Sequence, residues 1–468
     1  MGKKLWGGRF KKEVDKEFFE FQKSISYDYR LMEYDILHSI IHVGALNKAG
    51  ILSKPEAIKL INVLKGVENE INLELKQNKF KTRGAEDIHS LIQNKVEKKL
   101  GKRFSSLALK LHSLRSRNDQ VVFDTRFYCT EKSLEIQQAL LTFLGSLIEL
   151  IQDNLGKEFI GYTHTQRAQA IHFYNYLSAY HKMFLRDQGR LKRFEENLFV
   201  YIGAGALTGS SLTRRNYNDA IKELTSKREG KIKPTDDPID NVSDRDFIIE
   251  FLSIISILQM HLSRLAEDLI LYSTKEFNLL EIPEEFCTGS SLMPHKKNPD
   301  LLELVRGNTG KIYGNLVSIL TTMKGLPLSY NKDMQLDKEP LFFSVEIIEK
   351  ELKIMNKFIK KINLNEENIR KILDQDVALY ATEIAENLVK TAKMPFKRAH
   401  DTVGKFIKLL EKNNGNLNRI TDVDLRKLHP KLDKNLIKKI MKPGYAISQK
   451  KTFSRKVIQR RKKLINVD

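Results

Sequence analysis

The sequence predicts an all-α protein, and two observations carry that prediction. The 11 prolines leave two long gaps, from Glu56 to Lys233 and from Ile239 to Ile282. Because proline is excluded from helix interiors, these gaps permit very long helices. Apolar residues along the chain recur every three or four positions, the period of a helix, and no long stretch alternates as a strand would.

Three stretches predict the long helices in chain order. The first is Leu134–Leu155, which has a helical pattern. The second carries the apolar positions Phe247, Phe251, Ile254, Leu258, Leu262, Leu265, Leu269 and Tyr272. The third carries Leu301, Val305, Ile312, Leu316, Ile319 and Met323. Apolar stripes this long exceed an ordinary globular helix and predict a bundle of long helices buried between subunits.

Shifts in composition divide the chain into three predicted domains. An N-terminal helical domain of short, charged helices covers residues 1–111. A central long-helix bundle covers residues 112–361, and a small basic helical domain covers residues 362–468. A chain of 468 residues has room for two to four such units.

The net charge and its distribution along the chain indicate which class of binding partner to expect. The chain has 80 Lys and Arg against 59 Asp and Glu, a net charge of +21, which would suit nucleic acid, an anionic surface or small polyanions. Residues 431–468 hold 13 of the basic residues, two acidic ones and few aromatic ones. We therefore expect a solvated helical face there and no nucleic-acid binding. The moderately basic body favours a small polyanionic substrate.

The N-terminal sequence, the longest uncharged run and the cysteines together predict the cellular location. The start, MGKKLWGGRF, has no apolar core of a secretory signal, and the longest uncharged run, Asn197–Thr213, is broken by three glycines. We therefore expect no membrane span. Cys129 and Cys287 are the only cysteines and lie far apart, which favours a reducing cytoplasm over a disulfide framework or a zinc ribbon.

The densest group of reactive side chains is Thr288–Asp300, TGSSLMPHKKNPD. Its glycine, two serines and two prolines cannot continue a helix, so the segment must leave the bundle as a loop. Active sites concentrate on polar loops of rigid scaffolds, although many loops only connect helices.

This loop resembles the signature of the fumarase/aspartase superfamily, Gly-Ser-Ser followed by Met-Pro-x-Lys-x-Asn. The matching positions are Gly289, Ser290, Ser291, Met293, Pro294, Lys296 and Asn298. LHSLRSRNDQ at 111–120 and GYTHTQRAQ at 161–169 resemble the two earlier signature regions. WGGRF at 6–10, EDIH at 86–89, NVSDRDF at 241–247 and LPLSYNKDMQLDKEPLF at 326–342 are similar to the argininosuccinate lyase family in particular.

The resemblance implies a carbon–nitrogen lyase that cleaves argininosuccinate to L-arginine and fumarate, the last step of arginine biosynthesis, without a cofactor or a metal. Such an enzyme must remove a weakly acidic Cβ proton beside a carboxylate and then expel a guanidinium. The first step builds a doubly negative intermediate, so cations and N–H donors must be aimed at it in advance. A serine base would need a dry, electropositive pocket, which a closing loop would supply.

The resemblance also implies roles for particular residues. Ser290 would remove the Cβ proton, and His164, paired with Glu303, would be the partner acid or base at the departing nitrogen; which of the two is the base stays open. Lys296 would stabilise the intermediate. The implied substrate-binding residues are Ser24, His89, Arg117, Asn118, Thr163, Ser291, Asn298, Tyr330, Gln335 and Lys338.

In the family, three subunits of a homotetramer build each site, so the resemblance implies the same assembly here. Two alternatives stay open: another lyase of the superfamily, such as adenylosuccinate lyase, and a catalytically silent structural homologue. The sequence also departs from the family pattern. Leu114 stands where glycine is usual, which would strain the turn if the backbone there needs a positive φ. Thr165 stands where leucine is usual.

Two other patterns predict less. GAGALTG at 203–209 misses the G-x-G-x-x-G spacing and follows no predicted strand, so we expect a loop that lines the site and not a nucleotide cradle. His38 and His42 lie four residues apart on a predicted helix, a spacing that metal ligation can use, but no third ligand is apparent nearby.

Overall fold

The computed structural model describes residues 12, 14–82, 84–225 and 230–450. The chain forms two compact units. Unit 1 comprises Met1–Gln138, Gly189–Ile257 and Thr309–Glu349, and unit 2 comprises Ala139–Gln188, Leu258–Asn308 and Lys350–Asp468. The division into domains 1–111, 112–361 and 362–468 stays a prediction. The WGGRF segment and the end of the basic tail, residues 451–468, lie outside the described residues.

The described chain is predominantly helical, which confirms the all-α prediction. Its helices up to the first signature region are α1 (Lys16–Phe21), α2 (Ile25–Asp28), α3 (Met32–Lys48), α4 (Lys54–Lys76), α5 (Ile88–Leu100) and α6 (Ser105–Lys110). The middle helices are α7 (Arg117–Asp153), α8 (Phe173–Asn197), α9 (Arg214–Leu224), α10 (Pro238–Ser243), α11 (Asp246–Ser273), α12 (Asp300–Met323) and α13 (Lys338–Ile359). The last are α14 (Glu366–Gln375), α15 (Ala381–Ala392), α16 (Phe396–Lys412), α17 (Asp422–Leu428), α18 (Lys434–Ile440) and α19 (Pro443–Ser448).

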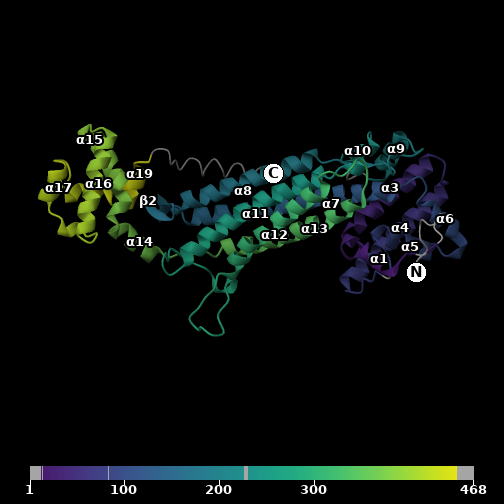
Figure 1. The fold of residues 1–468 in the computed structure, drawn as a ribbon, viewed down its shortest axis with the longest axis horizontal. Coiled ribbons are helices and arrows are strands. Elements are labelled where there is room, and N and C mark those ends of the chain that lie inside the picture. Colours follow the sequence, from purple (N-terminus) through teal and green to yellow (C-terminus); the bar gives the residue numbers. More distant parts are fainter. Residues whose placement is uncertain (1–11, 13, 83, 226–229, 451–468) are drawn as a thin grey trace. The chain divides into compact units, whose positions relative to one another are not determined.

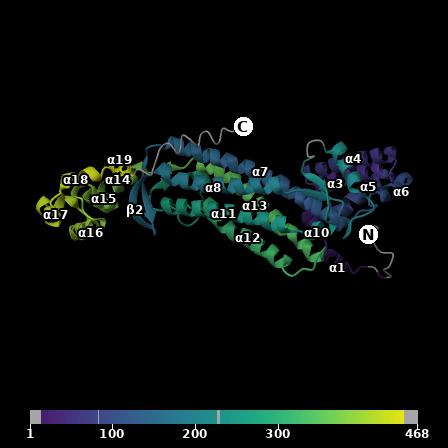
Figure 2. The same cartoon turned by 90° about the horizontal axis from the view of Figure 1, so that it is seen from above.

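The three predicted long helices are α7, α11 and α12, and α8 and α13 are two further long helices that the sequence analysis did not single out (Figures 1 and 2). All eight apolar positions predicted on α11 are buried. In unit 1, Phe194 of α8 stacks on Phe251 of α11, with ring centroids 5.0 Å apart. In unit 2, the Gln259 amide of α11 donates to Glu351 of α13 at 2.7 Å. The helical period therefore identified the core-facing side correctly.

Two of the N-terminal helices begin at a capping box. Ser53 and Glu56 form a capping box at the start of α4, with Pro55 in its first turn. Asp87 and Ser90 form a second capping box at the start of α5. The expectation of short helices in this part was wrong, because α3 and α4 are 17 and 23 residues long.

Three two-stranded sheets interrupt the helices. They are β1 (Glu158–Thr163) with β2 (Gln166–His172), antiparallel; β3 (Val200–Ile202) with β4 (Ile232–Pro234), parallel; and β5 (Leu280–Glu281) with β6 (Asn363–Leu364), antiparallel. β3 directly precedes the GAGALTG loop, so the expectation that no strand does so was wrong. Three residues are too short for alternation to be recognised in a sequence.

Two helices need comment as membrane candidates. By length and composition α7 and α11 could each cross a membrane. Of the most apolar windows, 44% in α7 and 61% in α11 are buried inside the protein. Core helices of a helical bundle have the same composition, so the expectation of no membrane span stays a prediction.

Candidate active site

The first group of predicted site residues lies in unit 1, around the start of α2. Ser24 precedes α2, and its hydroxyl donates to Asp28 at 2.6 Å. The other oxygen of Asp28 accepts the N–H of Ile88 at 3.2 Å, and the N–H of Ser24 donates to the carbonyl of Glu86 at 2.9 Å. The buried Asp28 carboxylate thus joins α2 to the EDIH segment.

The remaining members of this group surround the same junction. Arg117 pairs with Asp87 at 3.1 Å, and Nδ1 of His89 lies 2.9 Å from Asp35. The amide of Gln335 donates to the carbonyl of Gln22 at 2.9 Å. Ser24, His89, Arg117 and Gln335 are therefore held on neighbouring segments of unit 1, although they span more than 300 positions of sequence.

Lys338 is buried beside the Asp337 carboxylate, at 2.6 Å. The same carboxylate accepts from Nε of Arg245 at 2.5 Å, and both partners of that pair are buried. Burial raises the pKa of Tyr330 to about 12, so its hydroxyl stays protonated and can donate to a substrate at neutral pH.

Asn118, a predicted substrate-binding residue, lies beside the GAGALTG loop. Its amide is 3.5 Å from the carbonyl of Ala206, and so is the hydroxyl of Ser329. The buried Asp119 holds the start of the loop, because its carboxylate accepts the N–H groups of Gly203 and Ala204 at 3.1 Å.

The second group lies in unit 2, and part of it occupies the tip of the β1–β2 hairpin. Thr163 ends β1, and the two-residue turn His164–Thr165 has φ of +54° and +58°. Positive φ at both turn residues matches the right-handed twist of a hairpin. Histidine adopts this conformation more readily than most residues, whereas the β-branched Thr165 is strained in it. His164 is therefore held exposed on a strained tip.

An aromatic cluster supports the base of this hairpin. Tyr162 of β1 lies 5.2 Å from Phe277 and 5.7 Å from Tyr272, measured between ring centroids. Arg167 of β2 pairs with Asp376 at 3.2 Å. The tip of the hairpin is thus supported by packed side chains at its base.

The rest of the second group lies on the loop Thr288–Pro299, which leaves the bundle before α12 (Figure 1). Ser290, Ser291, Lys296 and Asn298 all lie on it. The Oγ of Ser290 accepts the N–H groups of Leu292 and Met293 at 3.3 and 3.0 Å. Two amide donors favour negative charge on that oxygen, which a serine needs in order to act as a base.

Within the described chain, no two of His164, Ser290 and Glu303 share a hydrogen bond or an ion pair. Glu303 is exposed on the first turn of α12. The structure therefore presents two groups, one in each unit. In the second group, the residues predicted to be catalytic are exposed or only half-buried.

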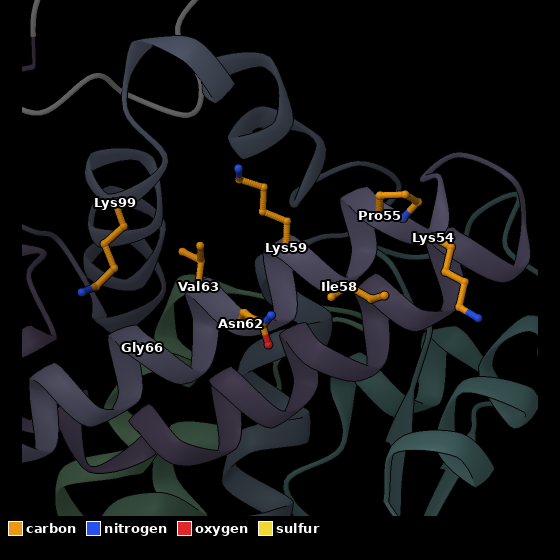
Figure 3. Close-up of a pocket in the computed structure, with 8 residues that line it drawn as sticks. All are labelled: Lys54, Pro55, Ile58, Lys59, Asn62, Val63, Gly66 and Lys99. Atoms are coloured by element: carbon orange, nitrogen blue, oxygen red, sulfur yellow. The ribbon is translucent and has the colours of Figure 1, made fainter.

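Of two pockets in the structure, one contains a predicted site residue and the other contains none. Figure 3 shows a pocket of about 710 Å³ in unit 1, lined by Lys54, Pro55, Ile58, Lys59, Asn62, Val63, Gly66 and Lys99. It contains none of the predicted site residues. A pocket of about 880 Å³ in unit 2 includes Lys296 and Met293 of the loop, together with Cys287.

One buried cluster has the composition of a metal site. Ligand atoms of Asp35, His89 and Asp124 lie within 4.8 Å of one another. Oδ1 of Asp35 already accepts hydrogen bonds from His89 and from the Gln120 amide, at 2.9 and 2.6 Å. This oxygen therefore belongs to a hydrogen-bond network. His42 is likewise occupied, since its Nε2 lies 2.8 Å from the carbonyl of Ser113 and its Nδ1 lies 3.1 Å from the hydroxyl of Tyr217. Nε2 of His38 approaches the Asp119 carboxylate at 3.5 Å without forming a hydrogen bond.

Comparison with known proteins shows the family to which this chain belongs. A family model described as "Lyase" matches residues 8–314, and one described as "Argininosuccinate lyase C-terminal" matches residues 378–448. The argininosuccinate lyase of Caldanaerobacter subterraneus is 43% identical over 86% of this chain and 88% of its own. That of Caldicellulosiruptor saccharolyticus is 42% identical over 86% and 84%. The chain belongs to the argininosuccinate lyase family.

Solved structures agree on the fold of this argininosuccinate lyase family member. An EDDS lyase variant with bound fumarate has a TM-score of 0.75 at 21% identity, over 92% of this chain and 84% of its own. A class II fumarase from Schistosoma mansoni has a TM-score of 0.74 at 17% identity, over 91% and 92%. At these identities the likeness concerns the architecture alone.

Four polar residues that hold the site of this family member were missed by sequence reasoning: Asp28, Arg245, Asp300 and Asp337. Arg245, Asp300 and Asp337 lie inside the recognised motifs, and Asp28 follows Ser24 by one helical turn. That spacing was the available signal for Asp28. The Arg245–Asp337 pair joins residues 92 positions apart, which no local pattern reveals.

Proposed function

We propose that this protein cleaves argininosuccinate into L-arginine and fumarate by a β-elimination that uses no cofactor, as a step of arginine biosynthesis. The observation that carries the mechanism is Ser290, whose Oγ receives two backbone N–H groups at the base of an exposed loop. Family membership selects the substrate, whose carboxylates and guanidinium match the amides, hydroxyls and cations of the two groups.

The reaction proceeds in two steps. Ser290 takes the Cβ proton, and the electron pair of that C–H bond moves into the adjacent carboxylate to give a doubly negative intermediate. Lys296 and the loop amides stabilise this charge. The Cβ–Cα double bond then forms as the bond from Cα to the guanidinium nitrogen breaks, and His164 supplies the proton to that nitrogen. Glu303 supports the charged imidazole.

We further propose that the active species is a homotetramer in the cytoplasm and that subunits share each site. In the single chain, Tyr313, Val317 and Leu320 of α12 form an apolar stripe at helical spacing and are 42%, 60% and 46% exposed. A stripe of this kind on a long helix fits burial between subunits. Both cysteines are free, which fits a reducing compartment.

The test is an assay of the purified protein with argininosuccinate, following fumarate by its ultraviolet absorbance. We expect fumarate to form, and Ser290→Ala to lower kcat by at least about 1,000-fold. Ser106→Ala, an exposed serine on α6, is the matched control and should keep the full rate. Cleavage of adenylosuccinate in place of argininosuccinate would contradict the substrate assignment. No turnover of either would support a silent homologue.

A further inference from the structure

The ends of the loop that carries Ser290 and Lys296 are fastened to one another. Thr288 and Asn298 exchange two backbone hydrogen bonds, of 3.2 and 2.8 Å. Asp300, the first residue of α12, adds a side-chain contact: one oxygen of its carboxylate accepts the N–H of Thr288 at 3.1 Å and also the Thr288 hydroxyl. Thr288, Asn298 and Asp300 are called the loop stem below.

Beyond the stem, the loop has few contacts with the rest of the protein. Leu292 is 85% exposed, and the hydrogen bonds of Ser290 are made to the neighbouring residues Leu292 and Met293. The N–H of Lys296 donates to the carbonyl of Met293, and Lys297 pairs with Glu281 at 3.2 Å. The direction in which the loop points is therefore set largely at its stem.

The Asp300 carboxylate is chemically suited to this task. A carboxylate that accepts from an N–H and an O–H forms stronger, more directional bonds than a neutral acceptor. Its charge is also favoured at the start of α12 by the helix dipole. Glu303, the proposed partner of His164, lies in the first turn of the same helix. The contact between Asp300 and Thr288 therefore joins the loop to the helix that carries Glu303.

We propose that Asp300 is a positioning residue: by binding Thr288 it fixes the orientation in which the loop delivers Ser290 and Lys296 to the substrate. Asp300 itself touches no reacting atom. This inference rests on the proposed function, because it assigns the loop to the chemical step. Since misplacement of a reacting group by about 1 Å can cost about 100-fold in rate, a loosened stem should affect catalysis far more than folding.

The experiment compares Asp300→Ala and Thr288→Val with the wild type. We expect Asp300→Ala to lower kcat by about 10- to 100-fold and to change KM by less than about 3-fold, because most of the proposed substrate-binding residues lie in unit 1 and are untouched. Thr288→Val removes only the hydroxyl and should lower kcat by about 3- to 10-fold. Thr288→Ser keeps the hydroxyl and should restore most of the rate.

Asp246→Ala is the matched control, since Asp246 is likewise the first residue of a long helix, α11, is exposed and belongs to unit 1, whereas the loop belongs to unit 2. It should leave kcat within about 2-fold. The double variant Thr288→Val/Asp300→Ala should be no slower than Asp300→Ala alone, because both changes remove one contact. Additive losses would overturn the proposal.

Limited trypsin digestion gives a readout that does not depend on turnover. Cleavage after Lys296 or Lys297, identified by the mass of the fragments, should be several-fold faster in Asp300→Ala than in the wild type or in Asp246→Ala. An unchanged cleavage rate, or a rise in KM at constant kcat, would overturn the positioning role. If the wild type does not cleave argininosuccinate but the cleavage rates differ as expected, the proposed function fails and the stem contact stands.

Discussion

Leu114 occupies a backbone conformation that suits glycine. Its φ is +58° and its side chain is 39% exposed, which confirms that the backbone at the position where the family has glycine takes a positive φ. A left-handed conformation costs a residue with a Cβ about 1–2 kcal/mol, and an exposed leucine recovers little of that by packing. The first signature region therefore carries local strain.

Replacing Leu114 by glycine should release this strain. We expect Leu114→Gly to raise the free energy of unfolding by about 1 kcal/mol, after the greater freedom of glycine in the unfolded chain is subtracted. Urea denaturation measures the difference. Leu114→Ala keeps the Cβ and serves as the control, with no gain expected. If alanine stabilises as much as glycine, the leucine side chain and not the backbone is the source of the strain.

Asp28 makes stability depend on pH. Burial raises its pKa to about 6, against the hydrogen bond from Ser24 and the charge of His89, which lower it. The folded chain therefore holds this proton more tightly than the unfolded chain, whose carboxyl has a pKa of about 3.8. The charged form costs stability progressively as pH rises from about 4 to about 6, and the full cost remains above that range.

The Asp28→Asn variant should be more stable than the wild type at pH 8 by up to about 3 kcal/mol, and equally stable at pH 4. The Ser24 hydroxyl can turn to accept from the new amide, so no buried partner is left unpaired. Urea titrations at both pH values measure the difference. Asp333→Asn, at an exposed position, is the control. A gain of the same size at both pH values would mean that ionisation of Asp28 is not its cause.

At the scale of the element, the sequence predicted the long helices but not the hairpin. Helices α7, α11 and α12 were predictable because their apolar period continues over many turns. The β1–β2 hairpin was missed, because its turn is His164–Thr165 and lacks the Asn-Gly or Asp-Gly pair that marks such a turn. The motif identified His164, but the position of the residue is set by packing of Tyr162 against Tyr272 and Phe277.

The GAGALTG loop depends on one residue of another element. Asp119 in the first turn of α7 is fully buried and accepts the N–H groups of Gly203 and Ala204. Removal of this carboxylate in Asp119→Ala would leave one buried and one partly buried N–H donor without partners, so we expect a loss of about 3–4 kcal/mol in the free energy of unfolding. Hydrogen exchange at the amides of Gly203 and Ala204 should accelerate at the same time.

Asp153→Ala is the control for the loss of stability expected in Asp119→Ala. Asp153 is the last residue of the same helix and is exposed, so its replacement should change stability by less than about 0.5 kcal/mol. Protection of the Gly203 and Ala204 amides that survives Asp119→Ala would show that the loop is held by other contacts.

At the scale of the molecule, the predicted site residues fall into two groups whose members come from interleaved stretches of the chain. Ser24, His89, Arg117 and Gln335 lie in unit 1, whereas His164, Ser290 and Lys296 lie in unit 2. The family resemblance proposed each of them singly. Which of them meet was not predictable, because that depends on long-range pairs such as Gln335 with Gln22 and on the proposed assembly.

Shared sites make a sharp prediction about mixed tetramers. Ser290→Ala and Arg117→Gln should each be nearly inactive alone, since one lacks the proposed base and the other a substrate-binding cation. If different subunits supply the two residues to one site, random co-assembly restores about a quarter of the sites. We therefore expect an equal mixture, unfolded and refolded together, to recover about a quarter of the wild-type rate.

The control for this mixing experiment is Ser290→Ala with Lys296→Met. Both residues lie on one loop of one chain, so every site of a mixed tetramer lacks one of them and no activity should return. Light scattering on each mixture checks that tetramers form, which keeps failed assembly apart from failed complementation. If Ser290→Ala and Arg117→Gln remain as inactive together as the control pair, one chain supplies both groups and the shared-site proposal is wrong.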